Sequence, residues 1–158
     1  MGEYRVEFIV NAEKISTTVK AEESLLKCLR QNGFTEVKCG CERGHCGTCT
    51  VILNKKAIKS CITLALQANH KEIWTVKGME KFDLGRKLQE SFVNYGAIQC
   101  GFCTPGMIIA AKNYLDQNTI PNREEIKKAI SGNLCRCTGY KKIVDAIYAV
   151  AIEKKKSK

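Results

Sequence analysis

The cysteines constrain this chain more than any other feature. Eight of its ten cysteines fall into two sets of four. The first set has the spacing C-x4-C-x2-C followed by a more distant fourth member, and consists of Cys41, Cys46, Cys49 and Cys61. The second set joins two short pairs that are far apart in the sequence, Cys100 with Cys103 and Cys135 with Cys137. Four thiolates per site, twice over, are the ligands that two iron–sulfur clusters require.

The bulk properties favour metal binding over disulfides. A chain of 158 residues is long enough for one ordinary domain or two small ones. Disulfides would suit a secreted protein, but Glu3, Arg5 and Glu7 interrupt the N-terminal segment where a signal sequence needs unbroken apolar residues. No later stretch approaches the roughly eighteen apolar residues of a membrane span. We therefore predict a cytoplasmic protein without a membrane span, whose paired cysteines bind metal.

The net charge says less about the function than the cysteines do. The formal net charge is +10, which at first suggests a nucleic-acid partner. Metal-bound thiolates would reduce this excess, and the sequence has no basic stripe interleaved with aromatic residues. We therefore expect no nucleic-acid partner, and instead a docking surface for an acidic protein.

The hydrophobic periodicity predicts an α+β chain with two domains, residues 1–77 and 78–158. In the first domain, alternating apolar residues predict strands at 4–10, 15–19, 50–53, 57–59 and 72–76. A short helix capped by Ser24 is expected between the second and third strands. In the second domain the spacing becomes helical. Four helices and no strand are expected, around 84–92, from Thr104, from Asn122, and over 141–152.

The loop CGCERGHCGTC, residues 39–49, favours a 2Fe–2S cluster on the first set. Three glycines lie among its cysteines: Gly40, Gly44 and Gly47. A loop that wraps a cluster turns its backbone N–H groups toward sulfur, and such turns are open mainly to glycine. Zinc usually takes two short pairs of ligands, one at each end of a loop. Three close cysteines with a distant fourth follow instead the spacing of plant-type 2Fe–2S ferredoxins.

The other candidate ligands are expected to have no metal role. Cys39 is expected to be a packed or partly exposed thiol, and Cys28 a core residue on the apolar face of the first helix. His45 would suit a Rieske-type site, but such a site uses two histidines, and His70 is far away in the sequence.

The second set is compatible with either a cluster or zinc. A cluster is favoured by the first site, because one electron-transfer centre is more useful with another close to it. Both short pairs also lie where helices are expected to begin, and backbone N–H groups there favour thiolate and an anionic cluster. Arg136, between Cys135 and Cys137, would either form an ion pair or raise the potential of the second cluster.

Three segments carry a family resemblance. Residues 99–107 (QCGFCTPGM) and 132–140 (GNLCRCTGY), with the 39–49 loop, closely resemble the small iron–sulfur subunit of the molybdenum hydroxylases. This is the family of xanthine dehydrogenase, aldehyde oxidoreductase and carbon monoxide dehydrogenase. The resemblance runs from the first strand to about residue 150, and it implies a β-grasp ferredoxin domain followed by an all-α four-helix bundle. One departure is Glu42, where many members of the family have glycine.

The resemblance also implies roles and partners. The first set of cysteines would ligate a 2Fe–2S cluster nearer a flavin, and the second set a 2Fe–2S cluster nearer a pterin. Gln99 and Cys137 would lie beside the pterin of a partner subunit. The molybdopterin would be held by a large subunit and FAD by a medium subunit, in a heterotrimer for which dimerisation is left open.

The implied function is that of an electron-transfer subunit within a multi-subunit oxidoreductase. We expect no catalytic residue in this chain, because it shows no nucleophile–base pair, phosphate-binding glycine loop or flavin motif. Xanthine or another purine is the first expectation for the substrate of the whole enzyme. Nicotinate, aldehydes, aromatic acyl-CoA and carbon monoxide are alternatives. A free-standing two-cluster ferredoxin or redox sensor is an alternative of another class, and a zinc-binding module is a third.

Overall fold

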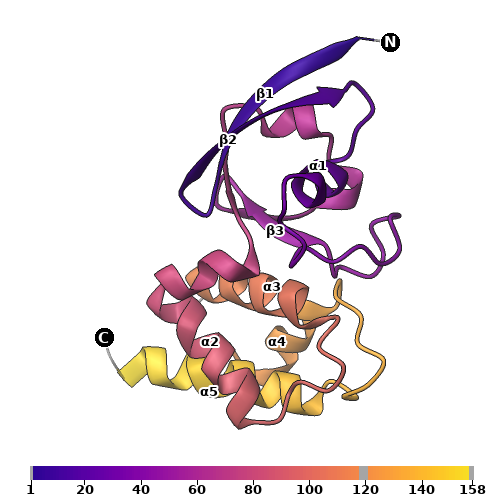
Figure 1. Ribbon diagram of the computed structural model, residues 1–158. Helices are drawn as coiled ribbons and strands as arrows, with labels where there is room; N and C mark the ends of the chain where they lie inside the picture. The colour runs from indigo at the N-terminus through magenta and orange to yellow at the C-terminus, as the bar shows by residue number, and fades with distance from the viewer. Residues whose placement is uncertain (1, 118–120, 157–158) are drawn as a thin grey trace.

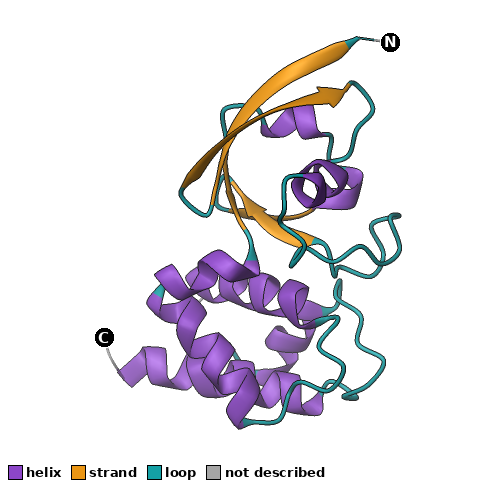
Figure 2. Cartoon of the chain, viewed as in Figure 1, coloured by secondary structure: helices purple, strands orange, loops and turns teal. Residues whose placement is uncertain are grey.

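The chain folds into two regions that lie one above the other in Figure 1. The computed structural model describes residues 2–117 and 121–156, so the outer limits of the predicted domains, residues 1 and 158, lie outside the described residues. We call residues 3–74 the sheet region and residues 76–156 the helical region (Figure 2). The predicted domain limit between residues 77 and 78 falls within the 3-10 helix η3, Val76–Lys81, which joins them.

The sheet region is a mixed five-stranded sheet in the order β2-β1-β5-β3-β4. Its strands are β1 (Glu3–Val10), β2 (Glu13–Lys20), β3 (Thr50–Leu53), β4 (Lys56–Lys59) and β5 (Glu72–Trp74). The neighbours β1 and β5 are parallel, and the other neighbouring strands are antiparallel. The five predicted strands are present, but β5 ends at Trp74, two residues before its predicted limit, because Val76 begins η3. Short 3-10 helices that the periodicity did not predict, η1 (Ser60–Ile62) and η2 (Ala65–Ala68), connect β4 to β5.

One helix supplies much of the core of the sheet region. Helix α1, Leu25–Gln31, begins where predicted, because the Ser24 hydroxyl accepts a hydrogen bond from the backbone N–H of Lys27 at 3.2 Å. Its apolar face packs against alternate residues of β1 and against β5. Cys28 is fully buried in this core, as predicted.

The helical region contains α2 (Asp83–Asn94), α3 (Thr104–Gln117), α4 (Arg123–Ile130) and α5 (Lys141–Lys156). Helix α2 packs against α3 and α5, and α4 packs against the same two helices. The predicted start of α4 is confirmed by a reciprocal cap, in which Asn122 and Glu125 each bind the other's backbone N–H, at 2.9 and 2.8 Å. Among the described residues, no helix combines the length and apolar character needed to span a bilayer.

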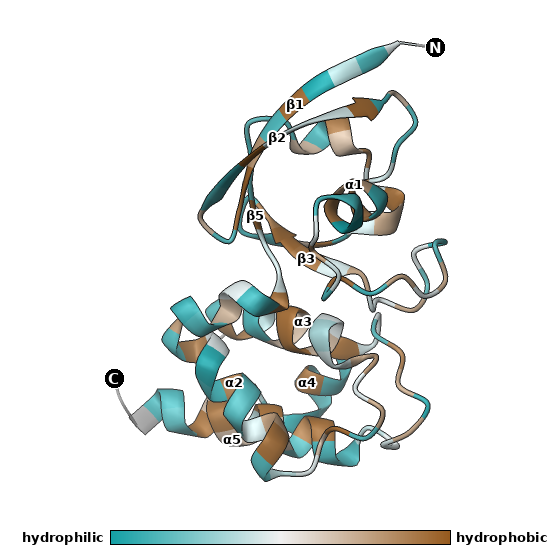
Figure 3. Ribbon diagram, in the orientation of Figure 1, coloured by the Kyte–Doolittle hydropathy of each residue, from teal (hydrophilic) through white to brown (hydrophobic). Residues whose placement is uncertain are grey.

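The two regions share a junction of apolar and polar contacts. Helix α3 packs against β3 and β4, and Ile52 of β3 belongs to the core of the helical region. Figure 3 shows apolar segments of β3 and α3 where the regions meet. Asn113 of α3 adds two hydrogen bonds across this junction, one to the Lys55 carbonyl at 2.9 Å and one from the Ala57 N–H at 3.3 Å. The junction therefore holds the cysteine-bearing loops of the two regions on one side of the molecule.

Candidate metal centres

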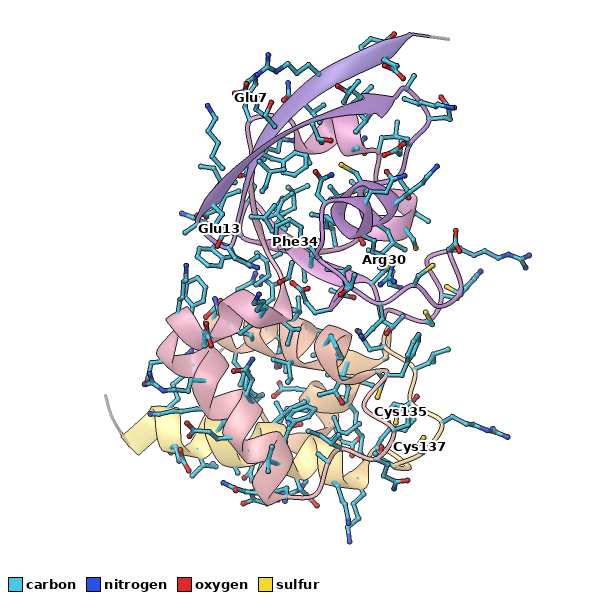
Figure 4. All side chains as sticks on the ribbon, in the orientation of Figure 1. Glu7, Glu13, Arg30, Phe34, Cys135 and Cys137 are labelled. Atoms are coloured by element: carbon cyan, nitrogen blue, oxygen red, sulfur yellow. The ribbon has the colours of Figure 1, made fainter. Side chains whose placement is uncertain are left out.

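Seven of the eight cysteines of the two sets lie on three loops. The first cysteine loop (39–49) leads into β3, the second (97–103) joins α2 to α3, and the third (131–140) joins α4 to α5. Figure 4 shows Cys135 and Cys137 on the third loop, which faces the first across the junction. Cys61 lies in η1, directly after β4.

The first cysteine loop points backbone N–H groups at Cys41. The Cys41 Sγ accepts hydrogen bonds from the backbone N–H groups of Arg43, His45 and Cys46 at 3.4, 3.3 and 3.3 Å. The N–H groups of Cys46 and Arg43 are the main cause that lowers the pKa of the Cys41 thiol to about 6. The loop thus favours a thiolate at Cys41, which is the form that binds metal.

The other thiols of the first set lie close together. Cys41 interacts with Cys46, and Cys61 interacts with Cys49. Burial and the neighbouring Cys49 together raise the pKa of the Cys61 thiol to about 11. Cys49 is buried, whereas the other three thiols are partly exposed. The first set therefore forms two adjacent pairs, one facing outward and one facing the core of the sheet region.

The glycines of the first loop meet two different demands. Gly44 and Gly47 have φ angles of +75° and +71°, a left-handed conformation that favours glycine. Gly40 instead allows close approach, because a Cβ there would lie 2.9 Å from the Cys46 Sγ. Glu42 also has a positive φ, +52°, at the position where the resembling family often has glycine. Its carboxylate accepts a hydrogen bond from the Cys39 thiol at 3.0 Å.

The second set is also made of two pairs. The Cys137 thiol donates to the Cys100 Sγ at 3.5 Å, and both residues are exposed. Cys103 and Cys135 form the inner pair, packed against the core of the helical region. Burial and the neighbouring Cys135 raise the pKa of the Cys103 thiol to about 12.

The third loop is also held by hydroxyl groups. The Cys135 Sγ lies 3.2 Å from the Thr138 Oγ1, and the Cys135 N–H donates to the Tyr140 hydroxyl at 2.9 Å.

The donor set fits two 2Fe–2S clusters. Such a cluster takes four thiolates, two for each iron, and each set of cysteines supplies two pairs of thiols. Within residues 2–117 and 121–156, no three or more His, Cys, Asp or Glu side chains gather as ligands of a single metal ion. The N–H groups on Cys41 match the negative charge that such a cluster carries.

Two other residues with a predicted role near the second cluster lie at the rim of the second set. Gln99 and Arg136 are both exposed, next to the outer thiols of Cys100 and Cys137. The sequence did not identify three side chains that hydrogen-bond to the cysteine loops: Thr48 bonds to the second loop, Asn133 to the first, and Lys59 of β4 to the first. Asn133 is part of the GNLCRCTGY segment, so only the resemblance gave a signal for it.

The pairs of thiols and their loops define a two-cluster iron–sulfur protein. Residues 8–73 match the model of the 2Fe-2S iron-sulfur cluster binding domain, and residues 75–148 match that of the [2Fe-2S] binding domain. The chain is 46% identical to the nicotinate dehydrogenase small FeS subunit of Eubacterium barkeri, over 95% of this chain and 97% of that one.

Two further relatives point to the same family. The chain is 43% identical to the xanthine dehydrogenase iron-sulfur-binding subunit of Escherichia coli O157:H7, over 78% of this chain and 79% of that one. In the crystal structure of quinoline 2-oxidoreductase from Pseudomonas putida 86, the matching chain superposes with a TM-score of 0.90 at 41% identity, covering 98% of this chain and 97% of that one. The chain therefore belongs to the small iron–sulfur subunits of the molybdenum hydroxylases, which are oxidoreductases.

Proposed function

We propose that this chain passes electrons from a large molybdopterin-binding subunit, through two 2Fe–2S clusters, to a medium subunit that binds FAD. The clusters supply one-electron redox chemistry, and the chain supplies their ligands and spacing. The ligands of the cluster nearer the flavin are Cys41, Cys46, Cys49 and Cys61. The ligands of the cluster nearer the pterin are Cys100, Cys103, Cys135 and Cys137. The observation that carries this proposal is the pairing of thiols in both sets, on loops that contact one another.

The surface around the second set supports docking of the molybdopterin subunit. Its outer thiols are exposed beside three apolar side chains, Ile98, Phe102 and Leu134, which are 37%, 47% and 54% exposed. Exposed apolar side chains that lie together mark interaction surfaces. Docking there would bring the pterin close to the outer pair of thiols, with Gln99 and Cys137 beside it.

The first cysteine loop has an apolar neighbour of its own. Ile62, which is 65% exposed, lies against Gly44, whose Cβ would be 2.9 Å from the Ile62 Cδ1. Leu64 is also exposed. The flavin subunit is assigned to this side, so that the two partners meet different ends of the pair of clusters.

We also propose a fold for each region. The sheet region, with α1 packed on its mixed sheet, is assigned to the β-grasp fold, and α2–α5 to a four-helix bundle. The domains are residues 1–77 and 78–158. The three subunits would form a heterotrimer.

The substrate class is taken from the relatives. Their names refer to nicotinate, xanthine and quinoline, which are all nitrogen heteroaromatic compounds. We assign the whole enzyme to hydroxylation of such a ring. The purine expected from the sequence is one member of this class, and identities of 46% and 43% are too similar to separate nicotinate from xanthine.

Anaerobic purification of the tagged chain from its native cells tests the proposal. The expected result is a complex of three different chains that contains molybdenum, flavin and about four irons per copy of this chain. After reduction, EPR should show two distinct 2Fe–2S signals. A tagged chain that purifies alone with both signals would instead indicate a free-standing ferredoxin. A colourless chain with zinc and no iron would overturn the proposal.

The substrate class is tested on the same complex. Nicotinate, xanthine, quinoline and an aldehyde are each mixed anaerobically with the oxidised complex. Bleaching of the iron–sulfur absorbance is expected with at least one of the heteroaromatic compounds. Bleaching only with the aldehyde would overturn the substrate assignment but not the electron-transfer role.

A further inference from the structure

Asn133 is the buried residue at the meeting point of the cysteine loops. It belongs to the third loop, two residues before Cys135, and the residue is only 5% exposed. Its Nδ2 donates to the Gly47 carbonyl at 2.8 Å and lies 3.4 Å from the Thr50 Oγ1. Both acceptors belong to the sheet region, more than eighty residues away in the sequence. A single amide group thus joins the third loop to the first.

The backbones around Asn133 are in direct contact. A Cβ on Gly47 would lie 2.3 Å from the Gly132 carbonyl oxygen, and a Cβ on Gly106 would lie 2.3 Å from the Gly47 carbonyl oxygen. The same hypothetical atoms would lie 2.7 and 2.8 Å from the Asn133 Nδ2. The amide of Asn133 therefore fills the space that Gly47 and Gly106 leave.

Two further hydrogen bonds cross between the loops beside Asn133. The Leu134 N–H donates to the Cys46 carbonyl at 2.9 Å, and the Thr48 hydroxyl donates to the Phe102 carbonyl at 2.7 Å. Each of these partners is a candidate ligand or lies next to one in the sequence. A shift of the third loop relative to the first would therefore change the separation of the two sets of thiols.

We propose that Asn133 is a positioning residue that fixes the separation of the two clusters, through its hydrogen bond to the Gly47 carbonyl. The inference rests on the proposed function, since it assumes that both clusters are present. The rate of electron transfer between two centres falls steeply as their separation grows. A buried amide that holds the loop in place would keep this separation short and the transfer fast. Supporting residues of this kind keep functional groups within about 0.5 Å of their working positions.

The test replaces Asn133 by leucine, which has a similar volume and no donor. The matched control is Asn113→Leu, which also removes hydrogen bonds between the two regions, but to Lys55 and Ala57 rather than to a cysteine loop. The purified complex is fully reduced, and EPR measures the splitting caused by the magnetic interaction of the two clusters. Pulse reduction measures the rate at which electrons equilibrate between them. Iron content is measured in every sample.

We expect Asn133→Leu to keep its iron and both EPR signals, while the splitting weakens and the equilibration rate falls at least threefold. Asn113→Leu should keep the splitting and rate of the unmodified complex. The inference is overturned if Asn133→Leu retains both values, if Asn113→Leu loses them equally, or if iron is lost. Should the leucine variant fail to fold, Asn133→Asp is used, which keeps the shape and replaces the donor by an acceptor. An unmodified complex without two EPR signals would instead refute the proposed function.

Discussion

The two sets of cysteines differ in how they are assembled. In the first set, three thiols come from one short loop and the fourth from η1, and all belong to the sheet region. In the second set, two thiols come from the loop before α3 and two from the loop before α5, so the packing of the helices must bring them together. The first site is therefore organised mainly by local backbone conformation, and the second by tertiary structure.

Exposure also separates the two sites. The first set has a buried member, Cys49, and none that is fully exposed, whereas Cys100 and Cys137 of the second set are both exposed. Three backbone N–H groups converge on Cys41, while the Cys100 Sγ of the second set interacts with the backbone N–H of Phe102 and with the Cys137 thiol. On the proposed function, the exposed second site would depend on the molybdopterin subunit to exclude water, and the first site would depend less on a partner.

The largest expected effect comes from removing one ligand. Cys103→Ser should abolish the second cluster and leave the first, so iron falls from about four to about two per chain and one EPR signal remains. Cys49→Ser should remove the other signal. Iron analysis and EPR of the reduced protein check both variants. Loss of both signals in both variants would contradict two independent sites.

A smaller but clear difference is expected in thiol reactivity. In the metal-free protein at pH 7, Cys41 should be alkylated before Cys61 and Cys103, because their thiol pKa values are about 6, 11 and 12. The alkylation rate of Cys41 itself should fall as the pH drops below 6, where its thiolate is protonated, while its lead over Cys61 and Cys103 persists. Peptide mass spectrometry identifies the labelled residue.

Cys39 is the control for exposure in this experiment. It is more exposed than Cys41, but a hydrogen bond to the Glu42 carboxylate raises the pKa of its thiol. If Cys39 reacted first at pH 7, exposure rather than the N–H groups of the loop would control reactivity.

The close approach of the Gly47 and Gly106 backbones predicts that a side chain added at Gly106 will destabilise the protein. Gly106→Ala places a Cβ 2.3 Å from the Gly47 carbonyl and should lower the free energy of unfolding by about 1–3 kcal/mol. In an ordinary helix the same change would stabilise by about 1 kcal/mol. Gly132→Ala is the control, since its Cβ would meet only the flexible end of Lys59, at 3.5 Å. Thermal unfolding distinguishes the two, and equal stability of both variants would show that the loops can separate at no cost.

The smallest expected effects are shifts in potential. The Lys59 Nζ donates to the Gly44 carbonyl of the first loop at 2.6 Å. Lys59→Gln removes a positive charge there and should lower the midpoint potential of the first cluster, because the reduced cluster is more negative. Glu42→Gln should raise it. Each shift should be at most about 60 mV, which is a tenfold change for a one-electron couple.

Redox titration followed by EPR measures both potentials in each variant. The potential of the second cluster should move less than that of the first in Glu42→Gln, because this side chain belongs to the first loop. Shifts of the same sign in the two variants would contradict an electrostatic cause.

Much of the fold could be predicted from the sequence because its signals are local. The alternation in β1 placed the first strand, and Ser24 and Asn122 marked the starts of α1 and α4 through hydrogen bonds that span only three residues. The cysteine spacing separated the two sets for a similar reason. The short 3-10 helices were not predicted, since they are too short to show a period.

The contacts between the sites could not be predicted in the same way. The hydrogen bond from Asn133 to Gly47 joins residues 86 positions apart, and nothing in either local sequence specifies its partner. Glu42 gave no turn signal either, because glutamate seldom adopts the left-handed conformation that it has here. The exposure of Cys100 and Cys137 depended on how α3 and α5 pack.

The contact between the Gly47 and Gly106 backbones also limits how this chain can be recombined with its relatives. A chimera that joins the first half of one homologue to the second half of another must bring two main chains into contact without any side chain to adjust the fit. Such a hybrid should assemble only if both parents carry glycine at these positions. In hybrids that lack either glycine, the two regions should fold but dock poorly against each other.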